Sequence, residues 1–205
     1  MNRILKNTFK KHFLCSKYKI IRIGSEKFLK YYILKFHTYF KGPHPEKTFI
    51  SKYLSGKGID VGCGGDKVIT SAIGVDLTPK GEYGKYGSQE FLKSQADICA
   101  LGDKLPMIKT GSLDYVVSRH CVEHFQDFLS PIFEWKRVLK KGGLLCIALP
   151  DDSMYNSIAI DPSHKHVFTT SSFKKIIELI GGFKIIKIHK IKESLSFVTI
   201  AERIN

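Results

Sequence analysis

Two short apolar segments, each with an aspartate at or next to its end, enclose a glycine loop, and this feature constrains the fold of the chain more than any other. Residues 58–61 (GIDV) precede the loop at 62–65 (GCGG), and residues 73–76 (IGVD) follow it. The pattern predicts a strand, a tight turn and a second strand that together bind a nucleoside. Only the seven residues 66–72 remain to connect the two strands. A crossover between parallel strands usually takes about a dozen residues and a helix.

The connector is nevertheless long enough for a parallel arrangement. Seven extended residues reach about 23 Å, whereas the return beside a four-residue strand takes roughly 13 Å and a sideways step of about 5 Å. We therefore expect residues 66–72 to form a bare loop or a single helical turn. One patch of the sheet then lacks its covering helix, and we predict that an aromatic helix at residues 28–40 covers part of it.

Strands and helices alternate along the rest of the chain, which predicts an α/β fold with a mostly parallel sheet and helices on both faces. The expected strands are residues 95–98, 113–118, 144–149, 183–191 and 196–202, the last two close enough to form an antiparallel hairpin. The expected helices are residues 127–139, ended by Lys140, Lys141 and Gly142-Gly143, and residues 173–180, capped by Ser171 or Ser172.

Composition fits a single globular domain with reduced thiols. The chain has 205 residues, of which 43% are apolar and 25% are charged. Both fractions are ordinary for a soluble protein of this length. The cysteines are scattered and form no C-x-x-C pair, which favours a cytoplasmic protein over a disulfide framework or a zinc site. They are Cys15, Cys63, Cys99, Cys121 and Cys146.

Positive charge is concentrated in the N-terminal segment. Residues 1–47 carry twelve basic and two acidic groups, a net charge of +10 out of +14 for the chain. We expect a basic helical extension at 1–47, with amphipathic helices near 3–14 and 26–40, followed by a catalytic domain at 48–205. The favoured interpretation is a helical cap with a solvated lysine face. The alternative is peripheral contact with an anionic membrane surface or an anionic substrate, since no segment is apolar enough to span a membrane and no signal peptide is evident.

The glycine loop favours one cofactor over the others. A dinucleotide-binding loop needs a glycine where this chain has Lys67, and no phosphate-binding loop that ends in Gly-Lys-Ser/Thr is present. S-adenosylmethionine carries no phosphate, so it needs only a tight glycine turn and an acid for the ribose hydroxyls. Gly62 and Gly64 provide the turn, and Asp76 provides the acid. Asp60 is expected to orient the loop or to meet the ammonium group of the methionine part.

Six blocks of sequence, in this order, resemble the class I S-adenosylmethionine-dependent methyltransferases of the type 11 methyltransferase-domain group. They are GIDVGCGG, AIGVD, ADICALGDKLP, GSLDYVVSRHCVEHF, EWKRVLKKGGLLCIALPD and DPSHKHVFT, and the resemblance covers residues 56–203. It implies a Rossmann-like sheet of seven strands, mostly parallel with an antiparallel last strand. It also implies cofactor contacts at Asp60, Gly62, Cys63, Gly64, Asp76, Leu77, Asp97, Ile98 and Ser118. The alternative roles left open are a turn cap for Asp60 and a helix N-cap for Asp97.

Histidines and one glutamate near the expected carboxyl edge of the sheet are the candidate catalytic residues. They are His120, Glu123, His124, His164 and His166. A histidine there can take the proton of a hydroxyl acceptor. HCVEH also matches an inverted zinc-protease motif, but His120 directly follows a strand, which disfavours that reading. We predict no metal, while leaving open a divalent ion on His120, Glu123 and His124, or a bracing role for His124.

Missing motifs favour an oxygen acceptor. The chain has no (Asn/Asp)-Pro-Pro-Tyr loop for amino-group methylation and no Pro-Cys pair for pyrimidine methylation. Chains that resemble this one are often linked with bacterial surface-glycan assembly. We therefore expect O-methylation of a sugar or of a glycan or lipid-linked intermediate, in the cytoplasm or at the inner face of the membrane. An RNA methyltransferase that uses the basic segment and a non-catalytic cofactor-binding subunit are the alternatives. Nucleic acid is the less favoured partner, and the oligomeric state is not predicted.

Overall fold

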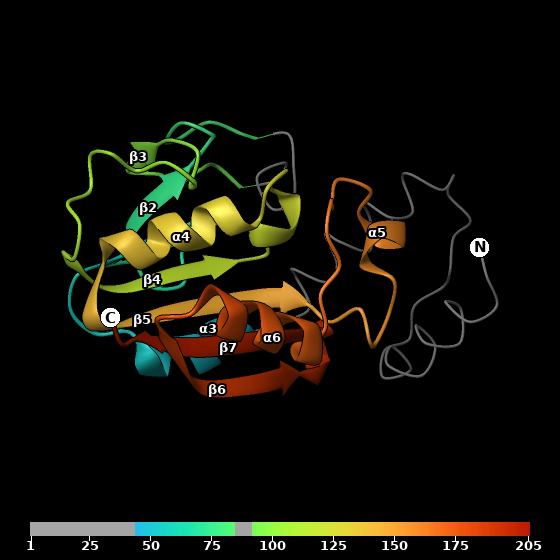
Figure 1. The fold of residues 1–205 in the computed structure, drawn as a ribbon. Helices are drawn as coiled ribbons and strands as arrows, with labels where there is room; N and C mark the ends of the chain where they lie inside the picture. The colour runs from blue at the N-terminus through green and yellow to red at the C-terminus, as the bar shows by residue number, and fades with distance from the viewer. Residues whose placement is uncertain (1–43, 85–91) are drawn as a thin grey trace. The chain divides into compact units, whose positions relative to one another are not determined.

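The computed structural model describes residues 44–84 and 92–205, which contain a sheet of seven strands (Figure 1). The strands lie in the order β3-β2-β1-β4-β5-β7-β6. They are β1 (Gly58–Val61), β2 (Ile73–Asp76), β3 (Ile98–Cys99), β4 (Leu113–Arg119), β5 (Leu139–Pro150), β6 (Phe183–Ile191) and β7 (Ser196–Arg203). The helices are α3 (Pro45–Ile50), α4 (Leu129–Val138), α5 (Ser157–Ile160) and α6 (Thr170–Ile180), with short 3-10 turns η1 (Ser51–Tyr53), η3 (Val122–His124) and η4 (Lys192–Ser194).

Strand directions agree with the expected fold. The five strands from β3 to β5 are mutually parallel, and β7 runs antiparallel to both β5 and β6. This confirms a seven-stranded, mostly parallel sheet with an antiparallel last strand. The hairpin expected from the spacing of the last two apolar segments is therefore also present. The carboxyl ends of β1, β2 and β4 lie at one edge of the sheet, which is where such folds bind ligands.

The short connector between β1 and β2 contains no helix. Ile59 pairs with Ile73 in a parallel ladder, and residues 62–72, all of them described, form only turns and bends. The expectation of a bare loop is confirmed. The geometry is possible because the loop leaves β1 through a sharp turn. The connector then has to return only along the length of a four-residue strand before β2 begins.

Apolar side chains alternate between the two faces of the sheet and form two cores. Helices α4 and α6 pack on one face, where Trp135 and Phe173 are fully buried. On the other face, Ile50 of α3 packs with Val68 and Ala72 of the connector (Figure 1). The segment α3–η1 therefore covers the area that a helix between β1 and β2 normally protects. The helices expected at residues 3–14 and 26–40 lie outside the described residues.

Several element boundaries differ from those expected. The third strand is β3, Ile98–Cys99, and not residues 95–98. Lys140 and Lys141 belong to β5 and not to the end of the preceding helix, because α4 ends at Val138 and Leu139 is already extended. Helix α6 begins at Thr170, so neither Ser171 nor Ser172 is its N-cap. Thr169 caps this helix, with Ser172 completing the capping box.

Helix α3 lies at the start of the described region. Pro45 occupies its first turn, where the missing N–H has no partner to lose. Helix α3 spans the expected boundary between residues 47 and 48, and the division into two domains stays a prediction.

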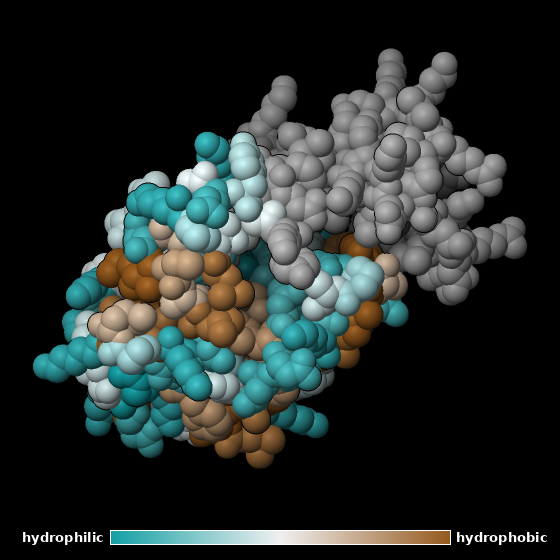
Figure 2. Space-filling model, turned by 90° about the horizontal axis from the view of Figure 1, so that it is seen from above, coloured by the Kyte–Doolittle hydropathy of each residue, from teal (hydrophilic) through white to brown (hydrophobic). Residues whose placement is uncertain are grey.

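On the surface, Figure 2 shows brown apolar groups among teal hydrophilic ones. Within residues 44–84 and 92–205, no helix combines the length and apolar character needed to cross a membrane.

Candidate active site

The glycine loop after β1 makes a turn that only glycine accepts easily. Gly62 and Gly64 have φ angles of 70° and 52°, in the left-handed region that side chains disfavour. A Cβ atom on Gly62 would lie 2.5 Å from the Cys121 Sγ atom. The Gly62 and Cys63 N–H groups donate to the Val75 carbonyl oxygen at 2.9 and 3.3 Å. The loop thus folds back on β2 and presents main chain, without side-chain bulk, at the edge of the sheet.

Asp76 lies beside this loop at the end of β2. Its side chain is buried and accepts hydrogen bonds from the Gly64 and Thr78 N–H groups, at 2.9 and 3.0 Å. A carboxylate oxygen can accept more than one hydrogen bond, which suits an acid that is expected to bind hydroxyls. Leu77 follows with 63% of its surface exposed. An oriented acid next to an exposed apolar side chain suits a ribose with an attached base.

Asp60 organises the connector. Its buried carboxylate accepts a 2.6 Å hydrogen bond from the Val68 N–H group. Burial raises the pKa of Asp60 to about 6, although the Val68 hydrogen bond and the nearby Arg119 act in the opposite direction. This geometry supports the loop-orienting role expected from the sequence. Contact with a cofactor ammonium group stays a prediction.

Asp97 is more exposed and holds the outer side of the site together. Its carboxylate accepts from the Gly74 N–H group at 2.9 Å and from the ammonium groups of Lys67 and Lys80 at 3.1 and 2.7 Å. The Lys80 hydrogen bond is the main reason why the pKa of Asp97 lies well below its usual value. The next residue, Ile98, pairs with Val75 of β2 and is half-buried near Asp76. This position suits an adenine contact by the Ile98 side chain.

The remaining predicted cofactor residues lie at the floor of this edge. Ser118 is buried at the end of β4, opposite Val61. Cys63 belongs to the glycine turn and Cys121 lies against Gly62, and burial raises the pKa of both thiols far above neutral pH. These cysteines are therefore protonated and unsuited to act as nucleophiles. Their position instead makes them packing groups around the loop.

His120 is held in an unusual conformation between two carboxylates. Its φ angle of 50° is rare for a residue with a side chain, and such strain is typical of functional sites. Its Nε2 atom lies 3.0 and 3.1 Å from the two oxygens of Glu46, and its Nδ1 atom lies 3.5 Å from Glu123 Oε1. Burial alone would lower the pKa of His120, but the charge of Glu46 and the contact with Glu123 raise it to about 10. His120 is therefore an imidazolium at neutral pH.

Glu46 is a site residue that the sequence did not reveal. It belongs to α3 and is completely buried, although it is a glutamate close to the start of the described chain. Besides His120, it accepts a hydrogen bond from the Ser196 hydroxyl and lies 3.7 Å from Arg119 Nη1. Burial acts to raise the pKa of Glu46, but His120 and Arg119 hold it well below its usual value. No motif signals this role, because only the tertiary fold brings α3 to the end of β4.

Glu123, His124 and His164 form a second group, which we call the imidazole–carboxylate cluster. One possible ligand atom from each residue lies within 4.8 Å of the others. The turn η3 contributes Glu123 and His124, and the loop after α5 contributes His164. The two segments are joined by a 2.8 Å hydrogen bond from the Lys165 N–H group to the Glu123 carbonyl oxygen. Burial lowers the pKa of His164, so its neutral form is favoured.

His166 is placed differently from the other histidines. Its Nε2 atom donates to the carbonyl oxygens of Phe125 and Gln126, at 3.0 and 3.2 Å. Its ring also meets the Phe128 ring edge-on, with the ring centroids 4.9 Å apart. The Nε2 atom therefore carries a proton, which main-chain oxygens hold in place. This geometry favours bracing of the loop after η3.

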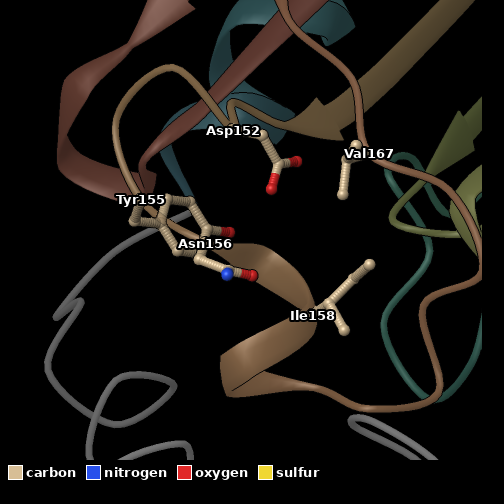
Figure 3. A pocket seen from close by; sticks show the side chains of 5 residues that line it. All are labelled: Asp152, Tyr155, Asn156, Ile158 and Val167. Carbon is tan, nitrogen blue, oxygen red and sulfur yellow. The ribbon is translucent and has the colours of Figure 1, made fainter. Parts of the chain in front are cut away.

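A cavity of about 380 Å³ opens beyond the end of β5. Figure 3 shows its lining side chains, with Asp152, Ile158 and Val167 pointing toward the same central space. Tyr155 and Asn156 complete the lining. Burial raises the pKa of Tyr155, and the negative charges of Asp152 and Glu123 add to the effect. The cavity therefore lies within electrostatic range of the imidazole–carboxylate cluster.

The chain is similar to known proteins in sequence over part of its length and in fold. Residues 59–147 match a protein-family model described as a methyltransferase domain. A comparison with curated protein sequences found no match. Among solved structures, an S-adenosylmethionine-dependent methyltransferase from Thermotoga maritima superposes with a TM-score of 0.62 at 17% identity. The alignment covers 87% of this chain and 97% of that protein.

Two further structures show the same fold. A methyltransferase of this class from Aquifex aeolicus has a TM-score of 0.57 and 13% identity, over 84% of this chain and 98% of its own. The 1,6-didemethyltoxoflavin-N1-methyltransferase of Burkholderia thailandensis, solved with its substrate and S-adenosylhomocysteine, has a TM-score of 0.59 and 12% identity, over 92% and 94%. The family match agrees with the expected resemblance and with methyltransferase activity over residues 59–147, and the solved structures confirm the expected fold. The roles assigned to individual residues stay predictions.

Proposed function

We propose that this chain is an S-adenosylmethionine-dependent methyltransferase that methylates a hydroxyl oxygen of a small polyhydroxylated acceptor, since residues 59–147 match a methyltransferase-domain model and the fold is that of such enzymes. A sugar or a glycan intermediate is the favoured acceptor class. The observation that carries the proposal is the cavity of about 380 Å³, which lies within electrostatic range of the imidazole–carboxylate cluster. Its volume lies in the range of about 300–1,000 Å³ that is common for small-molecule sites.

The lining of the cavity supports a sugar-like acceptor. Asp152 and Asn156 offer hydrogen-bonding groups, and Tyr155 offers an aromatic ring. Asp152 is held in place, because it accepts from the Ser157 N–H group at 2.9 Å and from the Phe168 N–H group at 3.3 Å. A rigid carboxylate and an aromatic surface can recognise a molecule that has hydroxyls on its rim and C–H groups on its face. Ile158 and Val167 close the apolar side.

We place the cofactor along the glycine loop and β2. The loop at Gly62 and Gly64 contacts the methionine part, Asp76 binds the ribose hydroxyls, and Leu77 and Ile98 lie against the adenine. This placement is supported by the main-chain surface of the loop and by the orientation of the Asp76 carboxylate toward it. Asp60 supports the loop from beneath through the connector.

The proposed reaction is an in-line displacement. The acceptor oxygen forms a bond to the methyl carbon, the carbon–sulfur bond breaks, and its electron pair stays on the sulfur. The enzyme contributes mainly by holding the acceptor oxygen behind the methyl group. His120 is unsuited to accept the hydroxyl proton, because both of its ring nitrogens face carboxylates. We therefore assign removal of that proton to the imidazole–carboxylate cluster.

Cofactor binding and turnover test this proposal separately. Calorimetry of Asp76→Ala should show an S-adenosylmethionine affinity at least ~10-fold weaker, about 1.4 kcal/mol, because the ribose hydroxyls lose their acceptor. The exposed Glu82 provides a control, and Glu82→Ala should bind normally. Mass spectrometry with free, nucleotide-linked and lipid-linked sugars should then detect transfer of one methyl group. Undiminished affinity in Asp76→Ala would contradict the cofactor placement, and methylation of bulk RNA alone would contradict the acceptor class.

A further inference from the structure

The imidazole–carboxylate cluster contains a carboxylate that its surroundings leave incompletely satisfied. The Glu123 side chain is 1% exposed, and neither of its oxygens has a hydrogen-bond partner among the described residues. The nearest imidazole nitrogens are His120 Nδ1 at 3.5 Å and His164 Nε2 at 4.0 Å from Oε1. A buried carboxylate without a hydrogen bond is costly, and native proteins rarely leave one in that state unless another group binds there.

Charge pairing with His120 does not account for Glu123. His120 already faces Glu46, whose two oxygens lie at 3.0 and 3.1 Å from its Nε2 atom. The His120 imidazolium thus lies closer to Glu46, which Arg119 also approaches at 3.7 Å, than to Glu123, whose Oε1 atom is 3.5 Å from Nδ1. The more distant carboxylate, Glu123, stays available for a second cation.

Hydrogen bonds fix the tautomer of His124. The Ser163 hydroxyl lies 2.5 Å from Asp161 Oδ1, to which it donates its one proton. The Ser163 oxygen lies 3.1 Å from His124 Nδ1, so it accepts the proton that this nitrogen carries. His124 Nε2 then keeps an available lone pair. A carboxylate that orients an imidazole in this way, here through a hydroxyl, is typical of the surroundings of metal-binding histidines.

The His164 ring lies near two carboxylates, those of Glu123 and Asp161. Its side chain is 9% exposed, and its Nε2 atom lies 4.0 Å from Glu123 Oε1 and 3.7 Å from Asp161 Oδ2. Its ring meets that of His124 edge-on, with centroids 4.7 Å apart. Two imidazoles and one buried carboxylate thus converge from two segments that a main-chain hydrogen bond holds together.

We propose that Glu123, His124 and His164 bind one divalent transition-metal ion. Imidazole nitrogens favour Zn²⁺, Fe²⁺, Co²⁺ or Ni²⁺ over Mg²⁺ and Ca²⁺, which prefer oxygen ligands. Two histidines and one carboxylate are also a common ligand set for sites that keep an open coordination position. Ligands of such an ion lie about 2.0–2.2 Å from it, so the three side chains must draw closer than the present limit of 4.8 Å.

Binding of the ion is tested on the purified full-length chain after treatment with a chelator. Calorimetry with Zn²⁺ and Co²⁺ should give one ion per chain, and Co²⁺ should develop visible absorption bands. Mg²⁺ should not compete. Glu123→Gln and His164→Ala should each weaken binding at least ~10-fold. His189 is exposed and lies on β6, so His189→Ala provides the control and should bind the ion normally.

Neither cofactor nor acceptor is present in this experiment, so its outcome is independent of the proposed function. Circular dichroism and the melting temperature of each variant without metal show whether it is folded. Absence of binding in the wild type would overturn the proposal. Equal affinity in a folded Glu123→Gln variant and the wild type would overturn it as well, since the ion would then be held by other groups.

Discussion

Glu46 has an unusual influence on the charge of the candidate site. A glutamate from a short helix before β1 places its carboxylate at the end of β4 and keeps His120 charged. A residue 74 positions before His120 thereby affects which histidines can act as bases. His164, whose pKa burial lowers, is left in its neutral form.

Replacing Glu46 by glutamine should destabilise the fold. The His120 imidazolium would lose its main counter-charge, and breaking such a pair costs about 3–5 kcal/mol when both groups are fully buried. The His120 side chain is 36% exposed, so we expect a smaller loss of about 2–4 kcal/mol. Urea unfolding measures the change. Glu178, which faces Lys174 on the surface of α6, provides the control.

Glu178→Gln should change the free energy of unfolding by less than about 0.5 kcal/mol, because exposed pairs contribute little. If Glu46→Gln is as stable as Glu178→Gln, the buried pair is not important for stability.

Among single side chains, the positions of Asp76 and the loop glycines could be predicted from the sequence, because local spacing determines where they lie. Glu46 could not, since its neighbours Pro45 and Lys47 carry no sign of burial.

Among the elements, the turn between β1 and β2 is the one where backbone geometry limits function most directly. Gly62 and Gly81 both have positive φ angles, of 70° and 84°. They differ in their surroundings. A Cβ atom on Gly62 would lie 2.5 Å from Cys121 Sγ, whereas one on Gly81 meets nothing within 4 Å.

Gly62→Ala should therefore affect the protein more than Gly81→Ala. Both variants pay the left-handed backbone penalty of about 1–2 kcal/mol, but only Gly62→Ala adds overpacking, which typically costs about 1–3 kcal/mol. We expect Gly62→Ala to lower S-adenosylmethionine affinity at least ~10-fold, while Gly81→Ala binds normally. Calorimetry and thermal melting measure the two effects. Equal behaviour of both variants would show that the Cys121 contact is unimportant.

The elements themselves were largely predictable. The order of strands and the bare connector followed from apolar periodicity and from the reach of seven residues. The start of β5 was wrong because Lys140 and Lys141 before two glycines are typical of a helix end. In the structure Leu139 leaves the helix in an extended conformation, and the ladder with β4 continues after an irregularity. Pairing with a neighbouring strand thus overrode the local signal.

For the molecule as a whole, two buried acids act on pH stability in opposite directions. Glu46 has a lowered pKa, so its contribution is lost as the pH falls. Asp60 has a pKa raised from 3.8 to about 6, so the folded state binds this proton more tightly than the unfolded chain. Its ionisation therefore destabilises the fold as the pH rises from about 4 to about 6.

Comparison with Asp60→Asn isolates the second effect. The asparagine does not ionise but keeps an oxygen that can accept from Val68. As the pH rises from 4 to 7, the free energy of unfolding of the wild type should fall relative to that of Asp60→Asn, by roughly 2–3 kcal/mol in total. Urea titrations at several pH values measure the difference. A difference that does not change with pH would contradict the raised pKa.

The hydrogen bond between Glu46 and Ser196 joins positions 150 residues apart. Ile50 of α3 likewise packs in one core with Val198 and Ile200 of β7. During synthesis on the ribosome, α3 is therefore made long before the strand against which it rests. Such distant contacts slow folding, and a nascent chain arrested before β7 would expose an apolar helix face and a charged carboxylate to chaperones and proteases.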